Sequence, residues 1–286
     1  MTRLDRRARV IYTPESQLKY PLRLLRQMGR DLLASRELAW RLMVRDISAQ
    51  YRQSFLGVFW AFVPAIATAL GLTLATNANI LNIGATSLPY PAFVMFSMTL
   101  WQTFTEALNG PIQAVNTAKP MLARINFPRE AIILSQLGQV FFNFGIKLIL
   151  IVGLFIWFKI PVSWTAILAP VALIHLIALG TAIGLLLVPI AALYDDINRG
   201  LTMVLGLWLF LTPVIYPVPQ SGTFATLVQL NPVTPLLVTV RELATTGVVS
   251  NPQGFWVASG LAIGGLLLGW LFYRVAIPFV VERISA

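Results

Sequence analysis

The stretch RDISAQYRQSFLGVFWAF, residues 45–62, changes within a few residues from charged to continuously apolar sequence. Arg45 and Arg52 precede the change, and the pair Leu56-Gly57 lies at it. Basic residues beside an apolar run are typical of the point at which a helix enters a membrane. We therefore expect a membrane protein in which Gly57 supplies a flexible corner between a surface helix and the first span.

The composition of the whole chain supports a membrane protein. Of its 286 residues, 57% are hydrophobic and 11% are charged, and the mean hydropathy is +0.75. Soluble domains carry about 25% charged residues, so this chain has too few charges to solvate a globular surface. Of the 21 Lys and Arg residues, 12 lie in the first 56 residues. Because basic segments beside a span stay in the cytoplasm, we expect a cytoplasmic N-terminus.

The composition also narrows the chemistry. The chain has no cysteine, which excludes disulfides and thiol chemistry. Its single histidine, His175, cannot form a His-rich metal cluster, and we expect it to be a packing residue rather than a proton relay. The pI near 10.5 comes from basic residues beside spans, where anionic lipid is the usual partner, so no nucleic acid is expected.

Several apolar segments are long enough to cross a membrane as helices. The hydrocarbon core takes about 20 helical residues, and backbone groups inside it must be paired within the segment. Five segments reach that length: 58–77, 92–114, 132–158, 166–193 and 257–277. A sixth, 201–216, is shorter and ends at the prolines of TPVIYPVP, which forbid a straight continuation. The predicted fold class is an all-α membrane protein with six transmembrane helices and both termini in the cytoplasm.

The region of about 213–254, before the last span, has a different character. It is moderately apolar, is interrupted by Pro232 and Pro235, and carries Arg241 and Glu242. It is too interrupted to span, and we predict a re-entrant helical hairpin, which requires protein or a watery cavity around the broken backbone. An ordinary external loop is the alternative.

The N-terminal region is predicted in two parts, a basic cytoplasmic segment at 1–34 and an amphipathic helix at 35–56. The helix carries an apolar stripe of Trp40, Val44, Ile47, Tyr51 and Phe55 and beside it a basic stripe of Arg41, Arg45, Ser48 and Arg52. This layout is typical of a helix in the membrane interface, with arginines at phosphate depth. The alternative, a soluble helix, has no soluble core to pack on. Residues 57–286 then form one transmembrane domain.

Charged and polar residues inside the spans are costly and are candidates for function. Glu106 and Lys147 lie in neighbouring predicted spans, but a simple antiparallel alignment offsets them by about seven residues, or about 10 Å, and so does not support a direct ion pair. Lys147 either snorkels outward or lines a polar pathway. Gln136, Gln139, Asn143 and Lys147 form a narrow polar stripe that indicates a subunit interface or conduit, and Glu106 caps that stripe in the alternative interpretation.

The sequence offers little for catalysis. It contains no G-x-x-x-x-G-K-[ST] motif, so the chain does not cradle a nucleotide phosphate in that way. The acidic pair Asp195-Asp196 follows Tyr194 in a short loop, where a solvated turn or helix cap is expected. We therefore expect a protein that is not an enzyme, with a membrane glycosyl- or acyltransferase as the alternative of another class.

An ordered set of motifs carries a family resemblance. RQSFLGVFWAFVPA, PYPAFVMFSMTLWQTF, NFPREAIILSQL, TPVIYPVP and LNPVTPLLVTVRELATTG follow one another in the chain. In this order they resemble the membrane subunits of ABC-2 type exporters of polysaccharides, the group that handles O-antigen, capsule and teichoic acid. The resemblance covers residues 35–280. It implies a bacterial inner-membrane permease for a lipid-linked polysaccharide such as O-antigen, with an ABC-2 exporter of a small drug or lipid as the alternative.

The resemblance also implies partners and site residues. It implies a homodimer with two copies of a cytoplasmic ABC ATPase, which binds ATP and Mg, so that this chain needs no cofactor or metal. A coupling helix at about 117–127 would present Lys119, Pro120 and Arg124 to that ATPase. The head group of the substrate would enter at Arg45, Tyr51, Arg52, Leu56 and Gly57. The expected channel-lining residues are Trp101, Phe104, Glu106, Gln139, Asn143 and Lys147.

Two features depart from the family pattern. The loop that commonly resembles Tyr-Arg-Asp in relatives contains Tyr194-Asp195-Asp196 here, so the resemblance does not carry over the basic contact expected there. The segment before residue 35 is longer than the shared motifs need, and the sequence assigns it no function.

Overall fold

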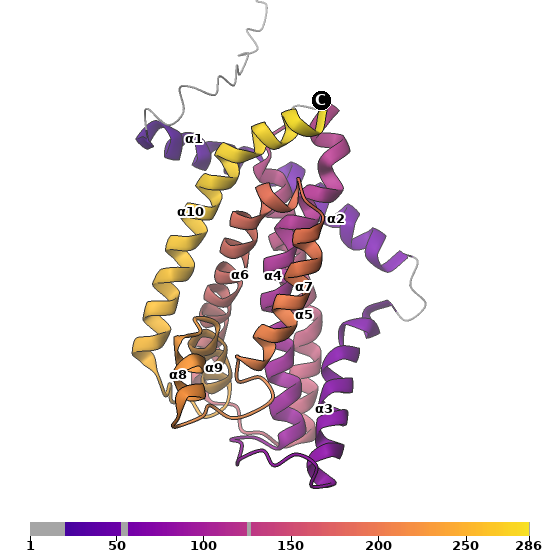
Figure 1. Cartoon of the computed structure of the whole chain (residues 1–286). Helices are drawn as coiled ribbons and strands as arrows, with labels where there is room; N and C mark the ends of the chain where they lie inside the picture. Colours follow the sequence, from indigo (N-terminus) through magenta and orange to yellow (C-terminus); the bar gives the residue numbers. More distant parts are fainter. Residues whose placement is uncertain (1–20, 53–56, 125–126, 286) are drawn as a thin grey trace, which may run out of the picture.

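The computed structural model describes residues 21–52, 57–124 and 127–285, and of residues 21–25, 51, 123, 284 and 285 only the backbone. All regular structure in these ranges is helical, as predicted (Figure 1). Leu56 and residues 1–20 of the predicted N-terminal segment lie outside the described residues. The helices are α1 Pro21–Ala34, α2 Arg36–Arg52, α3 Val63–Asn77, α4 Tyr90–Arg124, α5 Glu130–Trp157, α6 Ala169–Ala191, α7 Asp196–Phe210, α8 Thr223–Leu230, α9 Val233–Ala244 and α10 Pro252–Ser285, with 3-10 turns η1 Gly57–Ala61 and η2 Trp164–Leu168.

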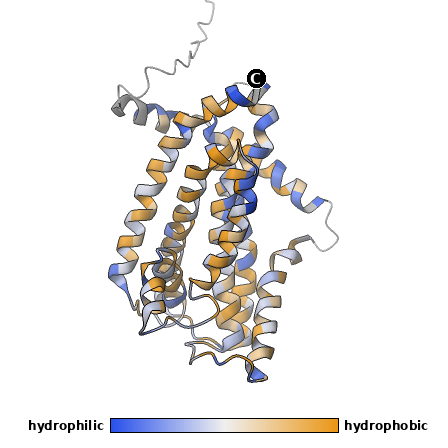
Figure 2. Cartoon of the chain, in the orientation of Figure 1, coloured by the Kyte–Doolittle hydropathy of each residue, from blue (hydrophilic) through white to orange (hydrophobic). Residues whose placement is uncertain are grey.

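The long helices α4, α5, α6 and α10 lie side by side with α7 in one bundle (Figure 1). We call its two ends the α4–α5 end, where residues 125–129 join those helices and the C-terminus lies, and the α8–α9 end. Hydrophobic residues dominate the length of the bundle, and hydrophilic ones are more frequent toward the α4–α5 end and on α2 (Figure 2). Helix α6 lies at the centre and packs most extensively against α4 and α10.

Glycines on α6 explain why it packs so closely on α4. A Cβ atom at Gly180 would lie 2.7 Å from the Phe104 carbonyl oxygen, and one at Gly184 would lie 2.3 Å from the Leu108 carbonyl oxygen. Gly269 of α10 likewise faces the Ala182 carbonyl oxygen at 2.9 Å. Helices in membranes associate by such small-residue contacts, because lipid gives them no hydrophobic drive to pair. The three helices α4, α6 and α10 therefore form the packed centre of the chain.

The helices identify a multi-pass membrane protein. Three of them are long and apolar enough to cross a membrane among the described residues: α5, α6 together with η2, and α10. The pair α8 and α9 would supply a fourth if it acts as one broken span, and α3 is a shorter apolar helix. Helix α4, with 35 residues, ends at Arg124 and so continues ten residues beyond the predicted end at 114. The predicted segment 201–216 corresponds to α7, which ends earlier, at Phe210.

The region before α10 contains two short helices, as predicted. Helices α8 and α9 meet at 82°, and Asn231 holds the bend. Its Oδ1 accepts hydrogen bonds from Trp208 Nε1 at 3.0 Å and from the Val233 amide at 3.1 Å, and its Nδ2 donates to the Leu211 carbonyl at 3.1 Å and to Thr212 Oγ1 at 2.9 Å. Helix α9 is buried along almost its whole length. This region is therefore a packed, bent helix pair, and its re-entry into the membrane stays a prediction.

Helix α2 runs obliquely to the bundle and extends away from it (Figure 1). It contacts α5 through Ala39, Leu42 and Met43, and Met43 Sδ lies 2.3 Å from the position of a Cβ at Gly138. Two members of the predicted apolar stripe face the other way, with Trp40 63% exposed and Val44 44% exposed. Phe55 and the side chain of Tyr51 lie outside the described residues. A soluble helix would bury that stripe against its core, so the outward apolar face favours contact with lipid.

Candidate functional site

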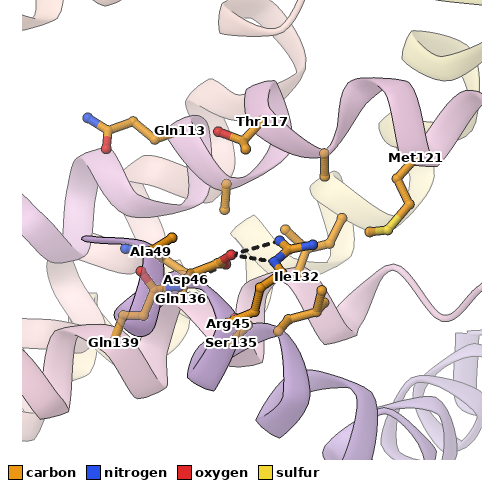
Figure 3. Close-up of a pocket in the computed structure, with 13 residues that line it drawn as sticks. Arg45, Asp46, Ala49, Gln113, Thr117, Met121, Ile132, Ser135, Gln136 and Gln139 are labelled. Atoms are coloured by element: carbon orange, nitrogen blue, oxygen red, sulfur yellow. Dashed lines mark hydrogen bonds and ion pairs between the residues drawn. The ribbon is translucent and has the colours of Figure 1, made fainter. Parts of the chain in front are cut away.

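A polar pocket of about 250 Å³ lies where α2 crosses α4 and α5 (Figure 3). We call it the α2 pocket. Residues spaced by three or four along each helix share a face, and this spacing brings polar groups from three helices to one place. Helix α2 contributes Arg45 and Asp46, α4 contributes Gln113 and Thr117, and α5 contributes Ser135, Gln136 and Gln139.

Asp46 organises the charges at this pocket. The Arg45 guanidinium donates through Nε to Asp46 Oδ1 at 2.8 Å, and its Nη2 lies 2.7 Å from the same oxygen. The other carboxylate oxygen accepts a hydrogen bond from Gln139 Nε2 at 3.3 Å. Asp46 thus joins α2 to α5 and also neutralises the arginine that the sequence proposes for an anionic head group.

Glu106 and Lys147 form a direct ion pair, which the simple alignment of the predicted spans did not support. The Lys147 side chain is only 2% exposed, which also excludes snorkelling. The difference came from the helix ends. In two antiparallel helices, residues at equal distances from the connecting loop lie opposite each other. Because α4 ends at Arg124 and α5 begins at Glu130, Glu106 lies opposite residue 148. The end predicted for this span from its apolar residues, residue 114, is ten residues before the end of α4.

The predicted polar stripe on α5 makes contacts within this chain. Gln139 bonds to Asp46 of α2, and Asn143 Nδ2 donates to Glu106 Oε2 of α4 at 3.4 Å, one turn before Lys147. Gln136 packs over Gly110, where its amide nitrogen lies 2.3 Å from the position of a Cβ. The stripe therefore binds α5 to α2 and α4, and Glu106 pairs with its far end as the alternative interpretation held.

Trp101 and Phe104 lie in the core of the chain rather than on a surface. They are 4% and 0% exposed. Their rings contact each other at 5.4 Å between centroids, and Trp208 of α7 lies 6.5 Å from the first ring and 5.5 Å from the second. A conduit along these rings would require α7 to move away from α4.

The residues expected at the ATPase contact lie at the α4–α5 end. Lys119, Pro120 and Arg124 belong to the last turns of α4, so most of the predicted coupling segment continues that helix instead of forming a separate one. Pro120 and Arg124 are exposed and Lys119 is half-buried.

Of the predicted entry residues, Arg52 is exposed and Gly57 has a φ of 49°, a left-handed conformation that favours glycine at the corner. The side chain of Tyr51 lies outside the described residues.

The acidic pair Asp195-Asp196 and His175 also have clear positions in the structure. Asp195 lies at the N-cap of α7 without a capping hydrogen bond from its side chain, and both it and Asp196 are exposed. The His175 Nδ1 lies 2.7 Å from the Val171 carbonyl oxygen, and its ring packs 5.6 Å from that of Phe255. His175 is therefore a packing residue, as predicted.

Sequence reasoning missed a buried ionic cluster at the α4–α5 end. Arg274 of α10 contacts Asp31 of α1 at 2.6 Å and also pairs with Glu130 at the start of α5. The neighbouring Tyr273 hydroxyl donates to the Arg129 carbonyl at 3.2 Å. The one sequence signal was Arg274 itself, an isolated charge near the end of an apolar run, but its partners are 144 and 243 residues away.

The burial of Arg241 in α9, and its contacts with α4, were also not predicted. Arg241 Nη1 donates to Ser97 Oγ of α4 at 2.7 Å and to the Pro213 carbonyl at 3.4 Å, and its guanidinium lies 4.2 Å above the Phe93 ring. A cation over an aromatic face is favourable where water is excluded. Arg241 therefore ties the bent helix pair to α4.

Comparison with known proteins identifies the family of the chain. The family model of the ABC-2 type transporter matches residues 37–244. The chain is 25% identical over 224 residues to the O-antigen export system permease protein RfbA of Myxococcus xanthus, covering 76% of this chain and 84% of that protein. It is 22% and 21% identical to two proteins of the same name from Klebsiella pneumoniae, each alignment covering 72% of this chain and 79% of the relative. The chain therefore belongs to the ABC-2 type transporter family and is a membrane transport subunit.

Proposed function

We propose that this chain is the permease of an exporter that moves a lipid-linked polysaccharide, similar to O-antigen, out of the bacterial cytoplasm across the inner membrane. The observation that carries the proposal is the similarity to three O-antigen export permeases over more than 70% of the chain. The position of α2 supports it, because an oblique helix with an outward apolar face and a basic edge suits collection of an anionic lipid-linked substrate.

The proposal includes a topology of six spans with both termini in the cytoplasm. Helices α3, α4, α5, α6, α7 and α10 would cross, and α8 and α9 would dip into the outer leaflet. The excess of basic residues before residue 57 supports a cytoplasmic N-terminus. The α4–α5 end would then face the cytoplasm, with α2 at the inner interface and residues 57–286 as the transmembrane domain.

The proposal also includes the partners. The energy would come from two copies of an ABC ATPase, which bind ATP and Mg, attached to a homodimer of this chain. The exposed Pro120 and Arg124 and the half-buried Lys119, at the end of α4, would contact that ATPase. The ion pair of Glu106 with Lys147 would keep α4 and α5 together when force is applied at this end.

The entry site of the substrate would lie along the basic edge of α2 and the corner at Gly57. Arg52, on the exposed edge, is the proposed contact for the diphosphate, and Arg45 lies seven residues earlier, about 10 Å along the helix. Tyr51 and Leu56 would complete the entry. Guanidinium groups suit this role because their planar fork matches phosphate oxygens.

A double variant tests the proposal. Arg45→Ala/Arg52→Ala should abolish surface glycan while leaving co-purification with the ATPase intact. The matched control Arg26→Ala/Arg30→Ala removes two exposed charges from α1 and should leave glycan export unchanged. Normal surface glycan in the entry variant would refute the entry site. If ATP hydrolysis by the reconstituted complex responds to small drugs but not to a glycolipid, the chain exports drugs or lipids instead.

A further inference from the structure

The α2 pocket has no net charge, which sets its chemistry apart from that of a phosphate site. Arg45 is the basic residue in its lining, and Asp46 already neutralises it at 2.7 Å. A phosphate placed in the pocket would meet the Asp46 carboxylate, and like charges at such distances repel. The pocket therefore suits a neutral polar group.

The polar lining matches a group that both donates and accepts hydrogen bonds. The amides of Gln113 and Gln139 offer donors and acceptors, and so does the hydroxyl of Thr117. A carboxylate such as Asp46 accepts from hydroxyls. Sugar hydroxyls both donate and accept, so they can use every one of these groups.

Ser135 supplies an independent sign of a ligand. It is 3% exposed, lines the pocket, and its Oγ finds no hydrogen-bond partner within the described part of the chain. An unpaired buried hydroxyl costs about 1–3 kcal/mol, so it persists in a fold only with some compensation. A hydroxyl or amide of a bound molecule would provide it.

The remaining lining and the size point to one sugar ring. Leu42, Met121 and Ile132 add apolar surface, against which the C–H faces of a sugar can pack. The volume of about 250 Å³ lies just below the range of about 300–1,000 Å³ found for whole small-molecule sites. Ala49, Gln113 and Thr117 are exposed, so the rim is open to the surface beside α2.

We propose that the α2 pocket binds the first sugar of a lipid-linked glycan, the ring directly attached to the diphosphate, and so selects the substrate by its sugar end. This inference rests on the export function proposed above. Arg52 would hold the diphosphate and the pocket would hold the ring, about 10 Å further back along α2. Helix α2 would thus take part in binding both the charged diphosphate and the sugar ring of the substrate.

Binding to the purified complex of this chain with its ATPase tests the proposal. The two probes are a polyprenyl diphosphate carrying one N-acetylhexosamine and the same polyprenyl diphosphate without sugar, measured by native mass spectrometry. The parent chain should bind the sugar-bearing probe about 10-fold more tightly than the sugar-free one, the size expected of one or two added hydrogen bonds. The sugar-free probe should still bind, through Arg52.

The variant Ser135→Ala makes the test specific. It should reduce the preference for the sugar-bearing probe about 5-fold, leave binding of the sugar-free probe unchanged, and leave the melting temperature unchanged or higher, because it removes an unpaired hydroxyl. The control Ser259→Ala removes another buried, unpaired hydroxyl, on α10, which contributes no residue to the lining of the pocket, and should leave the preference intact.

The binding results distinguish failure of the sugar site from failure of the proposed export function. Equal binding of both probes by the parent chain, or equal loss of preference in the Ser135 and Ser259 variants, would overturn the sugar site and leave the export proposal standing. If neither probe binds the parent complex, both the sugar site and the export of a polyprenyl-linked glycan are overturned.

Discussion

Lys147 of α5 and Glu106 of α4 form an ion pair inside the bundle, with Asn143 as a second partner of the carboxylate. The lysine is almost completely buried, whereas the side chain of Glu106 is 33% exposed. A buried charge that loses its partner is strongly unfavourable, because no water replaces the lost contact. This pair therefore fixes the register of the α4–α5 hairpin.

We predict that Glu106→Gln destabilises the protein by about 2–4 kcal/mol, because it leaves Lys147 buried without its counter-charge. The double variant Glu106→Gln/Lys147→Met should recover most of that loss, because it removes the orphaned charge as well. Thermal unfolding in detergent compares the variants. Additive losses in the double variant would show that the two residues do not depend on each other.

The ionic cluster around Arg274 should hold α1 against the bundle. Met28 of α1 is 1% exposed, and the chain contains no cysteine, so a single Met28→Cys reports the position of α1 cleanly. The cysteine should react slowly with a maleimide in the parent and at least about 10-fold faster after Arg274→Gln, because the lost pairs release α1. The control Glu37→Gln, which breaks an exposed pair with Arg41 at 2.6 Å, should leave the rate unchanged. A fast reaction in the parent would contradict the docking of α1.

The contact between α6 and α4 should tolerate no added methyl group. Gly184→Ala would place a Cβ 2.3 Å from the Leu108 carbonyl oxygen, and separating the helices should cost about 1–3 kcal/mol. Gly145→Ala on α5 is the control, since nothing lies within 4 Å of its Cβ position, and it should be neutral or slightly stabilising. Denaturation curves of the two variants check this, and equal stability would refute the close approach.

The bend between α8 and α9 should depend on Asn231. Asn231→Leu leaves the Trp208 indole N–H and the Val233 amide without their acceptor and should cost about 2–4 kcal/mol. Asn231→Asp keeps an acceptor for both groups and should cost less. The fluorescence of Trp208 reports the change, in a background where the other tryptophans are replaced by phenylalanine. Equal losses in both variants would show that the acceptor oxygen is not what holds the bend.

The sequence predicted the features that depend on local pattern. Helicity, the corner at Gly57, the short helices around Pro232 and the stripe on α5 all follow from periodicity and from the properties of glycine and proline. It failed where distant segments meet. The pair of Glu106 with Lys147 depends on α4 continuing through polar residues to Arg124, which no apolar run signals.

The same limit applies to the candidate site. The sequence placed Arg45 on a basic edge but did not indicate that its neighbour Asp46 neutralises it. Adjacent residues of a helix lie on different faces, and this pair forms only because the long arginine side chain bends back to the aspartate. The cluster of Asp31, Glu130 and Arg274 joins residues up to 243 positions apart. Such contacts follow from helix packing and not from spacing along the chain.

The glycine contacts of α6 have a mechanical consequence. Helices whose backbones touch at Gly180, Gly184 and Gly269 have no room to slide or tilt against one another, so α4, α6 and α10 must move as one stiff slab. Helix α7 packs on α6 far more sparsely than α4 or α10 does. A passage within a single chain would therefore open by displacing α7 from the slab, and its width would be limited by how far Trp208 can move from Trp101 and Phe104.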